Sequence, residues 1–190
     1  MGNQQELSNV CKTDLAWLAG MFNGDGCFSL TFAIRANNNV KCDLSLTLTQ
    51  CDPSIIEEAT RIMNMLEVNP GISQYQPGKE GNRIKYNLRI TKMAHIAKVI
   101  DAICCYMIGD KLAQAKLMRR YIERRIKYAD STKRQNGASI IHDNESVNIA
   151  KQFYALRESI GHSGIPKHVA DVLNDYPARE YGQVAGSARH

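Results

Sequence analysis

One short segment of the chain contains a side chain whose position could do chemistry. Asp25 stands near the end of the run Leu18-Ala-Gly-Met-Phe-Asn-Gly-Asp-Gly26. An aspartate carboxylate at the end of an apolar segment can bind a hard divalent cation such as Mg²⁺ through oxygen. The pairs Asn-Gly and Asp-Gly are also strong turn signals, so a simple turn is the alternative interpretation of the same residues.

The residues before Asp25 predict a helix with two unlike faces. Thr13 is positioned to cap this helix, and its apolar face carries Leu15, Leu18 and Phe22 at helical spacing. The opposite face, which we call the small face, consists of Ala16, Gly20, Asn23 and Gly24. A glycine inside a helix costs roughly 1 kcal/mol relative to alanine. Gly20 therefore indicates that another backbone approaches this face closely.

The residues after Asp25 alternate between apolar and polar types, which predicts an antiparallel hairpin with one face of each kind. Its strands cover residues 28–35 and 41–49, and Asp52 and Pro53 then begin a second helix. The pattern repeats with strands over residues 71–76 and 83–90. Two helices follow, predicted over 93–107 and 111–128. The fold class is therefore α+β, with the order helix–strand–strand–helix–strand–strand–helix–helix.

The chain divides into four parts by composition. Residues 1–12 form a polar, flexible lead, and residues 13–128 form the core. Residues 129–176 are predicted as a C-terminal helical extension, with a polar loop over 129–143 and helices over 145–160 and 166–176. Residues 177–190 contain little apolar side chain and are predicted to be a disordered tail.

Composition narrows the class of protein. The 190 residues are 44% hydrophobic and 23% charged, which is typical of a globular protein, and neither a membrane span nor a secretory signal is evident. We therefore expect a soluble, intracellular protein with no membrane partner. The 6 cysteines form no CxxC pair and are predicted to be free, buried thiols. The net charge is +5, and basic residues crowd residues 116–134, a distribution compatible with a polyanionic partner.

The segment 18–26, with Trp17 before it, resembles the LAGLIDADG motif of homing endonucleases and maturases. Five positions match the family name directly: Leu18, Ala19, Gly20, Asp25 and Gly26. Asn23 departs from the motif, because the family has an acidic residue there. The motif leads directly into the first strand of an αββαββα order, as in the family, and the resemblance covers residues 13–128. The chain is most similar to the single-motif, homodimeric, intron-encoded branch.

This resemblance implies an enzyme, a Mg²⁺-dependent endonuclease that makes a double-strand break in a long pseudo-palindromic DNA site. It implies Mg²⁺ or Mn²⁺ as cofactor, with Ca²⁺ binding without supporting cleavage. The small face of Ala16, Gly20, Asn23 and Gly24 is then the dimer interface. Each subunit supplies Asp25 as a metal ligand and catalytic residue, with the Gly24 carbonyl as a second ligand. By position, Gln50 contacts the active-site water shell and Lys111 reaches the cleavage site, where its charge can stabilise the transition state.

The polar strand faces are then the DNA surface of a saddle-shaped antiparallel sheet, which can lie in the major groove. The candidates are short hydroxyls, amides and charged side chains: Ser29, Thr31, Arg35, Lys41, Asp43, Ser45, Thr47, Gln74, Gln76, Arg83, Lys85, Asn87 and Arg89. A sheet with one buried face has a polar outer face whether or not it binds DNA. The alternative to a DNA surface is therefore a face that contacts only water.

Two other functions remain open on the sequence. One is an RNA-binding intron maturase of the same fold, with intron RNA as its partner. The other is a DNA-binding regulator without catalysis, which predicts loss of the acid and of the basic residue beside it. Asp25, Gln50 and Lys111 are all present, which favours the enzyme. An intron-encoded protein of this branch is expected in a chloroplast, a mitochondrion or a prokaryotic cytoplasm.

Overall fold

The elements follow the predicted order. The structure, a computed structural model, describes residues 10–34, 40–78, 83–131, 144–162 and 164–175. Its elements are α1 (Lys12–Gly24), β1 (Gly26–Ile34), β2 (Val40–Gln50), α2 (Pro53–Met65), β3 (Gly71–Tyr75), β4 (Lys85–Ile90), α3 (Met93–Ile103), the 3₁₀ turn η1 (Cys104–Tyr106), α4 (Gly109–Ser131), α5 (Asn144–Ser159) and α6 (Lys167–Asp175). The α+β prediction is confirmed. Residues 1–9 of the expected lead (1–12), Arg35 and the expected tail (177–190) lie outside the described residues.

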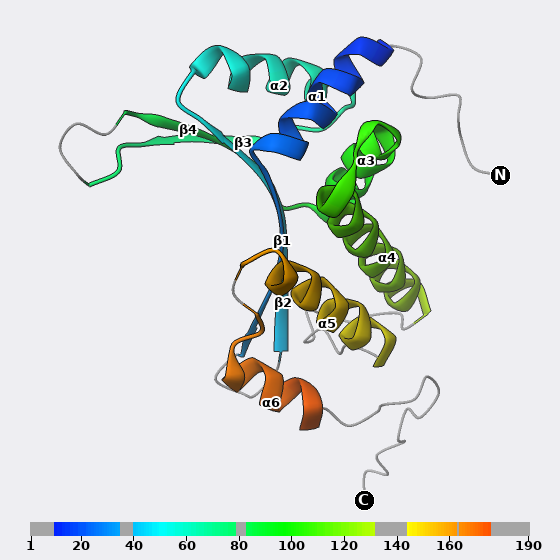
Figure 1. Ribbon diagram of the computed structural model, residues 1–190. Coiled ribbons are helices and arrows are strands. Elements are labelled where there is room, and N and C mark those ends of the chain that lie inside the picture. The colour runs from blue at the N-terminus through cyan, green and yellow to red at the C-terminus, as the bar shows by residue number, and fades with distance from the viewer. Residues whose placement is uncertain (1–9, 35–39, 79–82, 132–143, 163, 176–190) are drawn as a thin grey trace, which may run out of the picture.

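The four strands form one antiparallel sheet in the order β1-β2-β4-β3. In Figure 1 the sheet bends, so that β1 and β2 run down the molecule while β3 and β4 extend as an arm to the left. The helices α1, α2, α3 and α4 contact the sheet from one side. The polar side chains of the strands are left on the other side of the sheet.

Alternation along the strands explains which face the helices cover. Leu44, Leu46 and Leu48 on β2 are buried, as are their apolar counterparts on the neighbouring strands, Phe28, Leu30, Leu88 and Ile90. The amphipathic α2 buries Ile56, Ala59, Ile62 and Met63 against this layer. Burial of each such side chain stabilises the folded protein by roughly 1.5–3 kcal/mol. The helices, including α1, share this apolar core and are held by it against one face of the sheet.

The first helix begins differently from the prediction. Lys12 is its first residue and Cys11 is its N-cap, which makes no side-chain capping hydrogen bond. The expected cap, Thr13, lies inside the first turn, where its hydroxyl is 2.6 Å from the Cys11 sulfur. The predicted apolar face is confirmed, because Leu15, Leu18 and Phe22 are all buried.

The cysteines are free, as predicted, but their predicted burial is wrong. Cys11, Cys27, Cys51 and Cys105 are exposed, and Cys104 is half-buried. Cys42 is the most shielded, and burial raises the pKa of its thiol to about 12, against the smaller effect of a hydrogen bond with Tyr121. Apolar neighbours in sequence were a poor guide, because Cys27 lies on the polar face of β1.

The predicted helix over 93–107 is shorter than expected. It ends at Ile103, and a 3₁₀ turn and the extended Met107 follow before α4 begins at Gly109. Gly109 has φ +59°, a left-handed conformation that favours glycine, and it lets the chain turn sharply into α4. This break determines where the first turn of α4, with Lys111, points.

None of the helices in the described ranges is both long and apolar enough to cross a bilayer.

Gly26 provides a test of how tightly α1 is joined to the sheet. A Cβ atom at Gly26 would lie 2.6 Å from Phe22 Cα and 2.7 Å from the Phe22 carbonyl oxygen, both backbone atoms that cannot move aside. We expect Gly26→Ala to lower the free energy of unfolding by on the order of 1–3 kcal/mol through overpacking. The measurement is thermal unfolding followed by circular dichroism.

The matched control is Gly78→Ala, because nothing lies within 4 Å of a Cβ atom built at Gly78. This variant should unfold close to the wild-type temperature. Equal stability of the two variants would contradict the close contact between Gly26 and Phe22.

Candidate active site

Asp25 is held at the junction between α1 and β1. It is the C-cap of α1, and its backbone N–H donates to the Met21 carbonyl at 3.0 Å. Directly behind it, Gly26 packs against Phe22, whose ring lies 5.8 Å from that of Phe28 across the same junction. The backbone at Asp25 is therefore fixed by a buried core while its side chain is exposed.

Gln50, the last residue of β2, contacts Asp25 directly. Its side-chain Nε2 donates to Asp25 Oδ2 at 2.6 Å. The sheet register explains this contact, since Gly26 lies opposite Leu48 and Gln50 is two residues further along β2. Gln50 points to the same side of the sheet as Leu48. Its amide therefore extends past the end of the core toward the C-terminus of α1. This hydrogen bond restricts the orientation of the carboxylate.

Lys111 completes the cluster from the first turn of α4. Its ammonium donates to the backbone carbonyl oxygen of Gly26, next to Asp25 in the chain. Among the described residues, no ion pair joins Lys111 to an acidic side chain. The structure thus brings Asp25, Gln50 and Lys111 together from three separate elements and leaves the lysine charge uncompensated.

Asn23, the position that departs from the motif, contacts another part of the same chain. Its side-chain oxygen accepts a hydrogen bond from the backbone N–H of Ile108 at 3.5 Å. The side chain is half-buried against the connection between η1 and α4. This contact changes the interpretation of Asn23: its amide binds the turn that leads to Lys111, while Ala16, Gly20 and Gly24 on the small face are exposed.

The oxygen atoms at the end of α1 suit a hard cation. The Asp25 carboxylate is exposed, and the Gly24 carbonyl is among those that a helix C-terminus leaves without an intrahelical donor. Mg²⁺ prefers such oxygen ligands together with water and substrate phosphate. Within the residues that the structure describes, however, no group of three or more His, Cys, Asp or Glu side chains could hold a metal. Asp25 and the Gly24 carbonyl are therefore the candidate cation ligands at this helix end.

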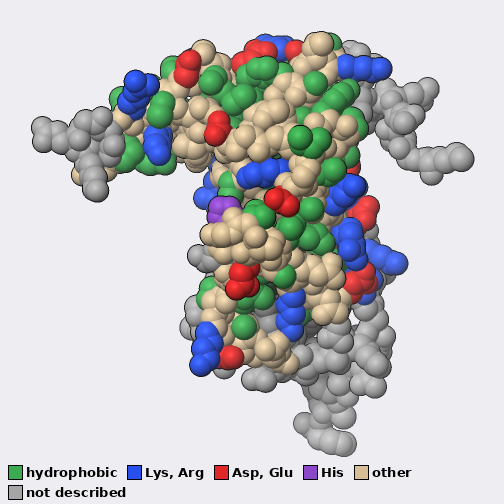
Figure 2. Space-filling model, viewed as in Figure 1, with side chains coloured by type: hydrophobic (Ala, Val, Ile, Leu, Met, Phe, Trp, Pro, Cys, Tyr) green, Lys and Arg blue, Asp and Glu red, His purple; other side chains and the backbone are tan. Residues whose placement is uncertain are grey.

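The polar face of the sheet collects most of the predicted DNA-contacting residues. Thr47 and Thr49 on β2 lie opposite Arg89 and Asn87 on β4, and Thr49 Oγ1 donates to Asn87 Oδ1 at 3.0 Å. Exposed or half-buried side chains occur at most of the other predicted positions, namely Ser29, Thr31, Asp43, Arg83 and Lys85. Lys41 is on β2, but its side chain lies outside what the structure describes. Figure 2 shows Lys and Arg side chains on the arm of β3 and β4.

Three predicted positions differ from this arrangement. Ser45 is on the polar face but is only 6% exposed, because a short side chain on an inner strand is shielded by its neighbours. Gln74 lies opposite Tyr86, so it shares the face of Leu88 and not that of Asn87 and Arg89. Gln76 lies one residue beyond the end of β3.

The register places Ser73 and Tyr75 on the polar face, and the sequence analysis missed both. They lie opposite Asn87 and Lys85. All five residues of β3 are exposed. The strand therefore has no alternation of buried and exposed positions that could tell one face from the other. The available signal was the pairing with β4, whose facing is evident from the buried Leu88 and Ile90.

The chain has the fold of the LAGLIDADG homing endonucleases, as the motif predicted. The homing endonuclease I-CvuI, solved with its target in the presence of Ca, matches with a TM-score of 0.53 and 16% identity over 90% of this chain and 96% of that chain. The LAGLIDADG meganuclease I-AabMI, solved bound to uncleaved DNA, matches with a TM-score of 0.55 and 16% identity over 87% of this chain but 50% of that chain. No protein-family model matches the chain.

A curated relative adds evidence from sequence. The probable intron-encoded endonuclease Cox1-I1b of Schizosaccharomyces pombe is 33% identical over 85 residues, 45% of this chain. The aligned part is 20% of that relative, so the similarity covers a small portion of its length.

Proposed function

We propose that this chain is one subunit of a homodimeric homing endonuclease that cuts both strands of a pseudo-palindromic DNA site with a divalent metal. The observation that carries the proposal is the convergence of Asp25, Gln50 and Lys111 at the end of α1. This cluster lies beside a sheet with an exposed polar face. Residues 13–128 are the proposed nuclease core and residues 129–176 its C-terminal helical extension.

The incomplete metal site supports a dimer. A second copy, packed along α1, would bring a second Asp25 to the same place. Gly20 and Gly24 have no atom within 4 Å of an added Cβ, so nothing in their own subunit requires glycine there. Trp17, 36% exposed, and Ile108, 74% exposed, add apolar surface near the small face. This chain matches 96% of the I-CvuI chain but 50% of the I-AabMI chain. Both values fit a chain that forms one of two equivalent halves of an active enzyme.

In the proposed reaction, a Mg²⁺ ion held by Asp25 and the Gly24 carbonyl would polarise the phosphate and lower the pKa of the attacking water. Gln50 keeps the carboxylate in one orientation through its 2.6 Å hydrogen bond. Lys111 holds a positive charge at the Gly26 carbonyl, where negative charge on a reacting phosphate would develop. The polar strand faces read the DNA, and base edges in the major groove suit their hydroxyl, amide and basic side chains.

The alternatives are less well supported. A regulator without catalysis has no need of a carboxylate, an amide and an ammonium gathered at one helix end. The intron-encoded relative supports an origin within an intron, in an organelle or a prokaryote. RNA is therefore a further partner to test in the binding assays below, with the same variants.

Asp25→Asn should abolish cleavage of a cognate duplex and preserve binding to it. The amide keeps the size of the side chain but removes the charge that would hold the metal, while recognition rests on the sheet. Binding without metal should equal or exceed that of the wild type, because clustered carboxylates repel phosphates. Single-turnover cleavage and gel-shift titration measure the two effects. Asp171→Asn, at an exposed position on α6, is the control and should cleave normally. Cleavage near the wild-type rate by Asp25→Asn would remove this residue from the proposed metal site.

Lys111→Met should slow single-turnover cleavage on the order of 10²-fold, the usual cost of losing a group that stabilises transition-state charge. DNA affinity should change little, because the ammonium is directed at the active site and not along the sheet. The control is Lys127→Met, which removes an exposed lysine further along the same helix. A fall in affinity at an unchanged cleavage rate would instead make Lys111 an ordinary backbone contact.

Gly20→Leu should convert the dimer into a folded monomer that does not cut DNA. A leucine at this position would hold two copies of α1 apart, although it meets nothing within its own subunit. Sedimentation velocity at micromolar concentration gives the oligomeric state, and circular dichroism verifies the fold. Ala155→Leu, an equivalent change at an exposed position on α5, should remain dimeric. A wild-type protein that sediments as a monomer would refute the proposed dimer.

A further inference from the structure

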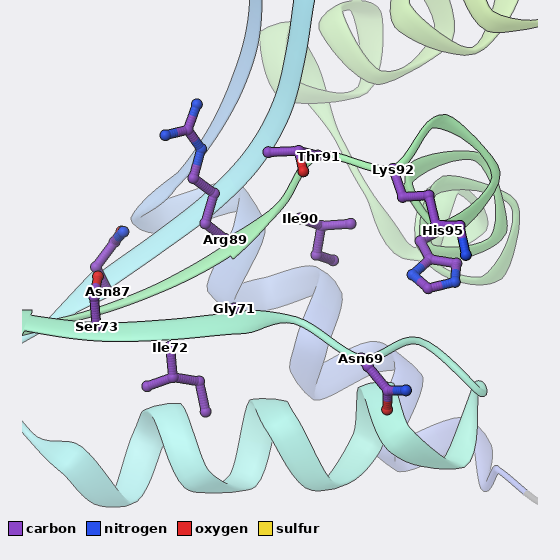
Figure 3. A pocket seen from close by; sticks show the side chains of 10 residues that line it. All are labelled: Asn69, Gly71, Ile72, Ser73, Asn87, Arg89, Ile90, Thr91, Lys92 and His95. Carbon is purple, nitrogen blue, oxygen red and sulfur yellow. The ribbon is translucent and has the colours of Figure 1, made fainter.

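A pocket of about 460 Å³ lies where β3 begins, β4 ends and α3 starts (Figure 3). The residues that matter for its chemistry are Asn69, Ser73, Arg89, Thr91, Lys92 and His95. They come from the segment before β3, both strands of the arm, the link to α3 and the first turn of that helix. This pocket is separate from the cluster of Asp25, Gln50 and Lys111, none of which lines it.

The lining is basic without a compensating acid. Arg89, Lys92 and His95 line the pocket, and no Asp or Glu does. Among the described residues, none of the three forms an ion pair. Lys98 on the same helix differs, because its ammonium lies 2.6 Å from Glu67. At the start of α3, Lys92 and His95 therefore lie without an ion-pair partner among the described residues. Further along the helix, Glu67 neutralises the charge of Lys98.

The neutral groups of the pocket also suit an anion. Thr91, Ser73 and Asn69 each offer a hydroxyl or amide donor (Figure 3). Lys92 is the N-cap residue of α3 and His95 lies in its first turn, so both side chains come from the start of this helix. Backbone N–H groups in the first turn of a helix add partial positive charge at the same end. The combination of lysine, arginine and hydroxyl or amide donors is typical of contacts to phosphate oxygens.

The pocket is continuous with the proposed DNA surface. Arg89 and Asn87 line it and also lie on the polar face, where Arg89 is opposite Thr47 and Thr47 is opposite Cys27. Cys27 follows Gly26, so Arg89, at the edge of the pocket, lies two strand spacings, roughly 10 Å, from the strand that begins at the active site. A duplex seated on the polar face with one phosphate at Asp25 would present a neighbouring backbone phosphate at about this distance.

We infer that this pocket, built around Lys92 and His95, binds a backbone phosphate of duplex DNA near the cleaved bond and so sets the register of the DNA on the sheet. The inference rests on the proposed endonuclease function. A DNA phosphate is favoured over a free phosphate ion because the lining includes exposed Lys92 and Arg89, and Arg89 also lies on the polar face of the sheet. The contact carries no base information and contributes equally to all sequences.

The test uses the full-length wild type and the variants Lys92→Gln and His95→Gln. Lys92→Gln removes one charged contact from each half-site, two per dimer, so it should reduce the slope of log affinity against log salt by about 2 and weaken binding at least on the order of tenfold near physiological salt. His95→Gln removes a hydrogen-bond donor and should weaken binding with a smaller change in slope. Cognate and non-cognate duplexes should be affected equally. Ethylation interference should identify one phosphate in each half-site whose modification weakens the wild type but no longer weakens Lys92→Gln. The control is Lys98→Gln, which removes a lysine from the same helix whose ammonium is paired with Glu67, and it should change neither readout.

The outcomes separate this site from the enzyme itself. If the wild type cleaves its duplex and Lys92→Gln leaves both the salt slope and the interference pattern unchanged, the pocket is not a DNA contact and the endonuclease stands. If the wild type neither binds nor cleaves duplex DNA, the proposed function fails first. The last experiment is a titration with inorganic phosphate. Binding of free phosphate that requires Lys92, together with unchanged duplex affinity of the variant, would overturn the assignment to DNA.

Discussion

The position of the whole site depends on one close contact, between the backbone of Gly26 and that of Phe22. There is no room for a side chain at Gly26, so α1 can end directly above the start of β1. Because Phe22 is buried and its ring packs near that of Phe28, the last turn of the helix is fixed to the sheet on which Gln50 lies. The carboxylate, the amide and the ammonium can meet because this junction is rigid. The glycines at positions 20 and 24 have no such role within the subunit.

Positive charge is distributed unevenly over the molecule. On the helical side, Arg61 pairs with Asp14 and Glu58, and Arg119 pairs with Asp101 and Glu123. On the sheet side and at the site, Arg89, Lys92 and Lys111 have no acidic partner among the described residues. Exposed ion pairs contribute little stability, so their main effect is to cancel charge locally. Arg89, Lys92 and Lys111 therefore leave positive charge on the face where DNA is proposed to bind.

The sequence predicted the fold well because burial produced clear patterns. Strict alternation in β1, β2 and β4 revealed the hairpins and the covered face, and the motif located Asp25 at the end of a helix. Gln50 and Lys111 came from resemblance alone, since their contacts depend on register and on the direction of α4. The misplaced residues lie where the pattern is weak. β3 buries none of its residues, so Gln74 was placed on the wrong face, and the role of Asn23 required the position of Ile108, 85 residues away in sequence.

The exposed edge strand has a further consequence for handling the free protein. β3 is one of the two edge strands of the sheet, and its Ile72 and Tyr75 are 56% and 49% exposed. Such an edge is a template on which another chain can add a strand. The strand is short, and Lys85 and Arg89 on its neighbour give each copy a like charge that repels another. At physiological ionic strength, salt screens charges that lie more than about 8 Å apart, and this distance shrinks as salt is added. High salt, which would release the protein from DNA, also removes the charge repulsion that keeps free copies from associating through this edge.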